Sequence, residues 1–223
     1  MKKIILFLIV FLLVGCNSGF GNSGTNDDYS LIPEKKVLDS VAIVDSSVTT
    51  QNIDNYLFRD DVIYVDLRPY SWVLKDGHIA GFGFYPFYDL IAHRQHEDRL
   101  FNMDLVYNEN GDKILGGSVG SFTPNYEESV MVINKLFPKD KYIFAISQSG
   151  LECCYFLNLL IQLDYDPAKL YNIGGFAIST GFENVAYKDI ENPRYLVEGN
   201  VMISSDINET FDFMKHLTPI GNN

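Results

Sequence analysis

Apolar positions along the chain form runs that alternate between strand length and helix length. Residues 61–66 are a short run rich in β-branched and aromatic side chains, and residues 141–146 form a second run of this kind. A third run begins at Lys169 and stops at Gly174-Gly175. Runs of this length and composition predict three β-strands, each ended by polar or small residues.

Two segments between these strands have helical character. Residues 151–163 are apolar nearly all round, and their one polar stripe is Asn158 and Gln162, four positions apart. Such a helix is covered on most sides. Residues 127–136 predict another helix, preceded by Pro124-Asn125 and followed by Phe137-Pro138. Alternation of strand and helix predicts an α/β domain with a mainly parallel central sheet and helices on both faces.

The C-terminal part continues beyond this pattern. Residues 195–197 and 200–203 are strand candidates, and a helix is expected from Ile207 to His216, begun by Asp206. These elements would add an edge hairpin and a covering helix. They carry no chemical motif.

The first residues have the pattern of an export signal. Two lysines precede an unbroken apolar run from Ile4 to Val14, which is too short to span a bilayer. Leu13-Val14-Gly15-Cys16 resembles the lipobox of bacterial lipoproteins, in which the peptide is cut before the cysteine and that cysteine is acylated. An ordinary signal peptide with a chance cysteine is the alternative interpretation.

This resemblance predicts a signal peptide at 1–15, a flexible tether at 16–36 and one folded domain at 37–223. Residues 17–30 are rich in Gly, Ser, Asn and Asp, with too few apolar side chains to offset the entropy of ordering. Acylation at Cys16 would anchor the protein to a bacterial membrane, in the cell envelope and outside the cytoplasm.

The net charge excludes some partners. The chain carries −12 overall, and loss of Lys2 and Lys3 with the signal leaves 15 basic residues against 29 acidic ones. A surface of that sign repels nucleic acid and anionic lipid headgroups, so no nucleic-acid partner is expected.

Apart from Cys16, the cysteines are Cys153 and Cys154, which are adjacent. Neighbouring Cα atoms lie about 3.8 Å apart, below the usual disulfide range of roughly 4.4–6.8 Å, so a bridge between them would be strained. Two buried thiols acting as small hydrophobes are the favoured interpretation. A redox or sulfur-carrying role is the alternative.

Three segments resemble, in order, the landmarks of rhodanese-like domains. They are Val65-Asp66-Leu67-Arg68-Pro69, then Gly77-His78-Ile79-Ala80-Gly81, then the loop at Ser147 followed by its helix and Gly174-Gly175. The resemblance covers about residues 60–176. It implies a rhodanese-like fold, with residues 87–139 as an insert that contains a hairpin and a helix.

Asp66, Arg68 and His78 are expected to be the scaffold of the site. Asp66 and Arg68 point the same way at a strand end, where charge-assisted hydrogen bonds can hold the next loop. His78 can hydrogen-bond loop backbone through a ring nitrogen.

Active members of this family use a cysteine thiolate that accepts sulfur as a persulfide. Backbone N–H groups at a helix N-terminus hold this thiolate. The resemblance places Ser147 at that cysteine and Glu152 at an arginine that often follows it. Serine cannot form a persulfide, and Glu152 adds negative charge beside an anion cradle. The predicted cradle comprises Ser147, Gln148, Ser149, Gly150, Leu151 and Glu152.

The insert has two further features. Asn110-Gly111 between two apolar runs predicts a hairpin. His93 and His96 lie in a polar cluster, but a spacing of three without a nearby cysteine is a weak metal signature, so a solvated helix end is the favoured interpretation. Most aromatic side chains of the insert are expected in the core, and a subset could form a binding rim beside the loop.

The sequence therefore predicts a lipid-anchored rhodanese-like module without sulfurtransferase activity, which binds a small anion, a peptide or a protein at the Ser147 loop. The alternative is a sulfurtransferase that uses Cys153, whose side chain is expected along a helix face and not in the cradle. A serine-based phosphatase or hydrolase is a weaker hypothesis. Neither a cofactor nor a metal is predicted.

Overall fold

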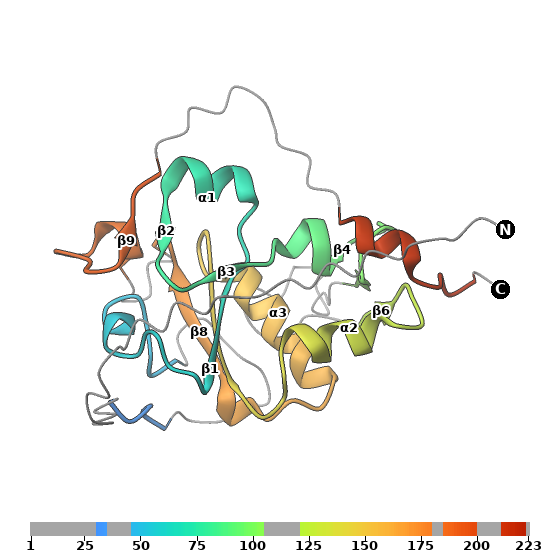
Figure 1. Cartoon of the computed structure of the whole chain (residues 1–223), viewed down its shortest axis with the longest axis horizontal. Coiled ribbons are helices and arrows are strands. Elements are labelled where there is room, and N and C mark those ends of the chain that lie inside the picture. Colours follow the sequence, from blue (N-terminus) through green and yellow to red (C-terminus); the bar gives the residue numbers. More distant parts are fainter. Residues whose placement is uncertain (1–29, 35–45, 105–120, 180–184, 200–210, 222–223) are drawn as a thin grey trace, which may run out of the picture.

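The structure is a computed structural model, and it describes residues 30–34, 46–104, 121–179, 185–199 and 211–221 (Figure 1). The predicted signal peptide, Cys16 and the hairpin at Asn110-Gly111 lie outside these residues. Within them, no helix has the length and apolar content needed to cross a membrane.

A parallel sheet of four strands forms the centre of the domain. Its strands are β1 (Val62–Asp66), β3 (Gly83–Phe84), β7 (Tyr142–Ser147) and β8 (Leu170–Gly175), in the order β3-β1-β7-β8. Strands β1, β7 and β8 have the apolar runs expected of strands buried on both faces. The parallel α/β architecture and three of the four central strands were therefore correctly predicted.

Two α-helices pack on one face of this sheet. They are α2 (Ser129–Leu136) and α3 (Leu151–Gln162), and α3 is buried from Cys153 to Leu160. Its polar stripe is satisfied: Asn158 Nδ2 donates to the Cys154 carbonyl at 2.9 Å. The larger core cluster combines side chains of both helices with Val65, Leu67, Ile143 and Ala145 of the sheet region.

Single turns of 3-10 helix and loops cover the opposite face. The turns are η2 (Ile53–Asn55) and η5 (Tyr187–Asp189). Ile53 and Tyr187 are fully buried and join a second core cluster with sheet residues Val62, Tyr64, Phe144, Ile146, Tyr171 and Ile173. The helical segments on this face are thus much shorter than α2 and α3 on the other face.

After β1, the chain forms α1 (Tyr70–Asp76) and then the short strand β2 (His78–Ile79), which pairs antiparallel with β9 (Leu196–Val197). Gly77 connects α1 to β2 with φ of 88°, and a Cβ there would collide with the Val197 carbonyl oxygen. The strand predicted at 195–197 therefore pairs with the segment around His78. The other strand candidate, at 200–203, lies outside the described residues.

The insert contains a second small sheet. A single π-helical turn, η3 (Phe87–Ile91), leads into β4 (Ala92–His93), which pairs with β5 (Phe101–Met103), and β5 pairs antiparallel with β6 (Phe122–Pro124). His93 and His96 therefore lie on a strand and the turn after it, which corrects the expectation of a helix end.

The C-terminal segment returns to the insert (Figure 1). A 3-10 helix, η6 (Asp212–His216), replaces the last part of the helix expected at 207–216. Tyr126 and Pro219 form an isolated β-bridge, and Glu128 accepts hydrogen bonds from Thr218.

A further single turn, η4 (Pro167–Lys169), precedes β8.

Residues 30–34 contact the domain at the amino ends of the strands. The Pro33 carbonyl accepts hydrogen bonds from Ser47 Oγ and Tyr171 Oη, both at 2.9 Å. Arg59 Nη1 donates to the Ser30 carbonyl at 2.9 Å. The last part of the predicted tether is therefore bonded to the folded domain.

Candidate functional site

The loop between β7 and α3 lies at the carboxyl end of a central parallel strand. Ser147 is the last residue of β7, and α3 begins at Leu151. Ligand sites of open α/β sheets occupy this edge, because helix N-termini there present unpaired N–H groups. The loop is the place where this fold would hold a reactive group.

The Ser147 hydroxyl is directed inward. Its side chain is fully buried, and Oγ accepts a hydrogen bond from the Gly150 N–H at 2.8 Å. Gly150 has φ of 85°, a left-handed conformation that residues with a Cβ adopt rarely. The hydroxyl thus occupies one backbone N–H donor that an anion in the loop would need.

Gly174-Gly175 allows this loop to lie against β8. A Cβ on Gly175 would collide with the Ile178 carbonyl oxygen and lie 2.9 Å from Ser149 Cα. A Cβ on Gly150 would lie 3.1 Å from the Gly174 carbonyl carbon. The Gly-Gly pair is therefore explained by close backbone packing.

Asn172 is a site residue that the sequence interpretation missed. Its side chain is buried in β8, where Nδ2 donates to the Gly150 carbonyl at 3.0 Å and Oδ1 accepts from the Gly174 N–H at 3.0 Å. Nδ2 also lies 3.4 Å from the Cys154 sulfur. A polar residue inside an otherwise apolar buried strand is the signal that could have identified it.

Asp66 and Arg68 form a completely buried ion pair beside the loop. Arg68 Nε lies 2.9 Å from Asp66 Oδ1, and Nη2 lies 2.6 Å from Oδ2. Nη2 also donates to the Gly77 carbonyl at 2.8 Å, and the guanidinium carbon lies 3.7 Å above the Phe176 ring centroid. The pair therefore connects the end of β1 to the Gly77 turn and to the residue after Gly175, whereas Arg68 Nη1 has no partner among the described residues.

His78 packs against an aromatic ring. Its ring centroid lies 5.1 Å from that of Phe84 in an edge-to-face arrangement. Burial, more than the opposing effect of Asp66, lowers the pKa of the imidazole, which is therefore neutral at pH 7. The expected hydrogen bond from this ring to loop backbone does not form within the described part of the chain.

Cys153 and Cys154 are free, buried thiols in α3, as expected. Burial raises the pKa of Cys153 well above its usual value, and the hydrogen bond with Ser147 only partly opposes this effect. The sequence interpretation placed Cys153 away from the cradle. Ser147 lies close enough to Cys153 to act on the pKa of its thiol, so the sulfur is near the first residue of the loop.

Two side chains of the loop carry buried acceptor oxygens without partners. They are Gln148 Oε1 and Glu152 Oε2, neither of which has a hydrogen-bond donor among the described residues. The Glu152 charge also reaches Tyr88, whose phenol pKa is raised chiefly by burial and then by that charge. The loop therefore offers acceptors and negative charge, which favour a donor group over an anion.

The histidines of the insert do not complete a metal site. The rings of His93 and His96 lie 4.1 Å apart, and His96 Nδ1 lies 3.7 Å from Asp98 Oδ1. Among the residues that the structure describes, no group of three or more His, Cys, Asp or Glu side chains is arranged to hold a metal ion.

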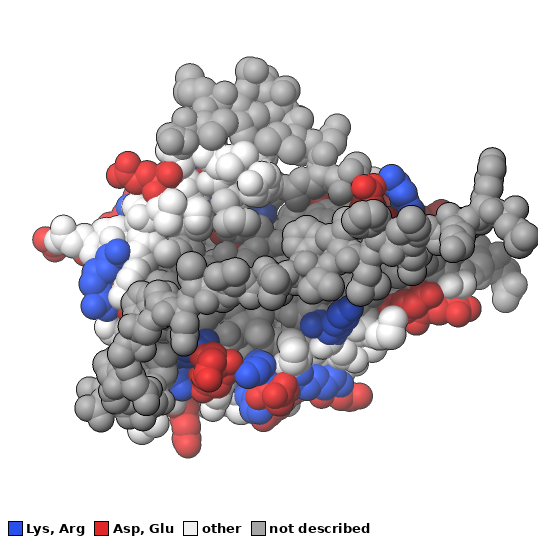
Figure 2. Space-filling model, in the orientation of Figure 1, with Lys and Arg blue, Asp and Glu red and all other residues white. Residues whose placement is uncertain are grey.

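The visible surface carries charges of both signs. Figure 2 shows Lys and Arg side chains intermixed with Asp and Glu along the lower rim of the molecule, without a large patch of one sign among the coloured residues.

Searches of protein-family models, of curated proteins and of solved structures returned no match to this chain.

Proposed function

We propose that this chain is a lipid-anchored rhodanese-like module of the bacterial cell envelope that binds a partner and does not transfer sulfur. The observation that carries the proposal is the state of Ser147. Its hydroxyl stands at the expected nucleophile position, is fully buried and already accepts a hydrogen bond from Gly150. A serine in that position has no sulfur to form a persulfide.

Two candidate bases for activation of the hydroxyl, Asp66 and His78, are already engaged elsewhere. Serine nucleophiles need a neighbouring group that accepts the proton. The Asp66 carboxylate is engaged with Arg68 at 2.6 Å, and the His78 ring packs on Phe84. These contacts also disfavour serine-based phosphatase or hydrolase chemistry.

The proposed occupant of the loop is a peptide or protein segment that carries hydrogen-bond donors. Gln148 Oε1 and Glu152 Oε2 are buried acceptors without donors among the described residues, and an unmade hydrogen bond at a buried group costs about 1–3 kcal/mol. Because both oxygens are closed off from solvent, a partner would have to displace these side chains before its donors removed that cost. A small anion would instead meet the Glu152 carboxylate.

Sulfur transfer through Cys153 is the second candidate function. The nearness of its thiol to Ser147 favours it, because Ser147 occupies the position that the resemblance assigns to the nucleophile. Its complete burial and raised pKa oppose it, since the thiolate is the nucleophile.

A thiosulfate and cyanide assay, read as thiocyanate formation, separates these functions. The purified full-length chain in detergent would be assayed beside Ser147→Cys, Cys153→Ala and, as a matched thiol control, Cys154→Ala. The proposal expects no turnover in the wild type. Wild-type turnover that is lost in Cys153→Ala and kept in Cys154→Ala would establish the second candidate instead.

A further inference from the structure

A pocket of about 230 Å³ lies between the insert and the C-terminal segment and shares no residue with the Ser147 loop. This volume is just below the range of about 300–1,000 Å³ that holds drug-sized ligands, so the pocket suits a smaller metabolite. Its lining residues come from η3, the turn before β5, the loop before α2 and η6: Asp89, Asp98, Arg99, Tyr126, Phe211, Met214 and Lys215.

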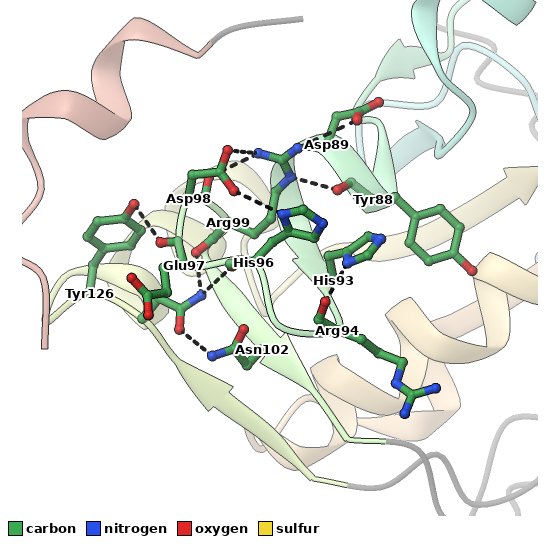
Figure 3. Close-up of polar contacts among 11 residues, drawn as sticks. Tyr88, Asp89, His93, Arg94, His96, Glu97, Asp98, Arg99, Asn102 and Tyr126 are labelled. Carbon is green, nitrogen blue, oxygen red and sulfur yellow. Dashed lines mark hydrogen bonds and ion pairs between the residues drawn. The ribbon is translucent and has the colours of Figure 1, made fainter. Parts of the chain in front are cut away.

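Arg99 is held in place at the polar side of this pocket (Figure 3). Its Nε donates to the Tyr88 carbonyl at 2.7 Å, and Nη1 lies 2.7 Å from Asp98 Oδ2. The side chain is only 17% exposed. Two fixed partners orient the guanidinium and leave Nη2 directed toward Asp89, as Figure 3 shows.

Arg99 Nη2 and Asp89 Oδ1 form an open ion pair. They lie 3.8 Å apart, which is too long for a hydrogen bond. Asp89 accepts no hydrogen bond from any residue that the structure describes, and neither does Nη2 donate one to them. A positive donor and a negative acceptor therefore lie side by side at the pocket, and neither atom has a hydrogen-bonding partner in the described part of the chain.

The other side of the pocket is apolar. Phe211 and Met214 come from the C-terminal segment, and Tyr126 also lines the pocket, with its hydroxyl donating to the Glu97 carbonyl at 3.0 Å. Lys215 is engaged with Asp212 at 2.7 Å, so its charge is already paired. The pocket thus combines one open ion pair with an apolar wall.

We propose that this pocket binds a small zwitterion, namely a free α-amino acid with an apolar side chain. The ammonium group bonds to Asp89, the carboxylate bonds to Arg99 Nη2, and the side chain packs on Phe211 and Met214. A simple carboxylic acid would leave Asp89 unpaired beside its own negative charge. A simple amine would leave the Arg99 donors unpaired.

Three probes of one size test the pairing of charges. L-phenylalanine carries both groups, 3-phenylpropionate lacks the ammonium, and phenethylamine lacks the carboxylate. Binding to the full-length chain in detergent would be measured by isothermal titration calorimetry. We expect phenylalanine to bind at least about tenfold more tightly than either analogue, since each analogue loses one charge-assisted hydrogen bond.

Asp89→Asn and Phe211→Ala are the informative variants, because neither removes a hydrogen bond that connects described residues. Asp89→Asn should weaken the binding of phenylalanine about tenfold and leave the affinity for 3-phenylpropionate unchanged or higher. Phe211→Ala should weaken the binding of all three probes. Circular dichroism would verify that both variants are folded. Equal binding of the three probes, unchanged phenylalanine binding in Asp89→Asn, or no heat of binding at about 10 mM phenylalanine would overturn the proposal.

Discussion

Replacement of Asp66 by asparagine would test whether the buried ion pair holds the candidate site together. The change keeps the shape of the side chain and removes its charge. Arg68 would then be a cation with no counter-ion and no exposure to water, because both side chains are 0% exposed. Its bond to the Gly77 carbonyl would remain but cannot neutralise it.

The expected cost follows from this burial. Removal of one partner from a buried ion pair typically costs about 3–5 kcal/mol, against about 0–1 kcal/mol for an exposed pair. The chain contains a matched control, because Arg59 and Asp61 have the same spacing and a distance of 2.7 Å, with the Asp61 side chain 41% exposed. At about 2–4 °C per kcal/mol, Asp66→Asn should lower Tm by roughly 10 °C and Asp61→Asn by less than about 4 °C.

Thermal unfolding followed by circular dichroism would measure both variants. A third variant, Asp66→Leu with Arg68→Met, removes both charges and should lose less stability than Asp66→Asn, because no buried charge is left alone. Equal losses in Asp66→Asn and Asp61→Asn would refute the reasoning, and so would a double variant less stable than the single one.

Three further outcomes are expected. Gly175→Ala should lower the free energy of unfolding by about 3 kcal/mol in a urea titration, because its Cβ meets loop backbone. Gly221→Ala, at an exposed position, should change it by less than about 0.5 kcal/mol, and equal effects would contradict the packing argument. The hydrogen bond from Arg59 lowers the pKa of Asp61, so the stability advantage of the wild type over Asp61→Asn should be complete above about pH 4 and shrink as the pH falls through the lowered pKa; a constant difference down to pH 2 would contradict it. The Cys153 thiol should react with a disulfide reagent at pH 8 only after unfolding in urea, because it is buried and its pKa is raised; fast reaction of the native chain would show that the helix opens there.

The elements with continuous apolar runs could be predicted from the sequence. Helix α3 ends at Gln162, one residue before the predicted end, and β7 and β8 follow their runs closely. Strand β3 could not be predicted in this way, because its two residues, Gly83 and Phe84, carry no periodic signal. Its pairing with β1 depends on tertiary contacts alone.

The candidate site was predicted as a set of residues but not as an arrangement. The pairing of Asp66 with Arg68 follows from their positions two apart at a strand end. The bond between the Gly150 N–H and the Ser147 hydroxyl depends on the positive φ of Gly150, which no hydrophobic pattern specifies. The pocket beside Arg99 joins segments more than a hundred positions apart, so only the fold brings its charges together.

The contacts of residues 30–34 bear on how the domain would face a membrane. Pro33 and Ser30 bond to Tyr171 and Arg59, at the edge where the parallel strands begin, and Ser147 stands at the edge where they end. With lipid on Cys16 as proposed, the chain would run from the bilayer to the first edge. The Ser147 loop would then lie at the edge of the sheet opposite the point of attachment.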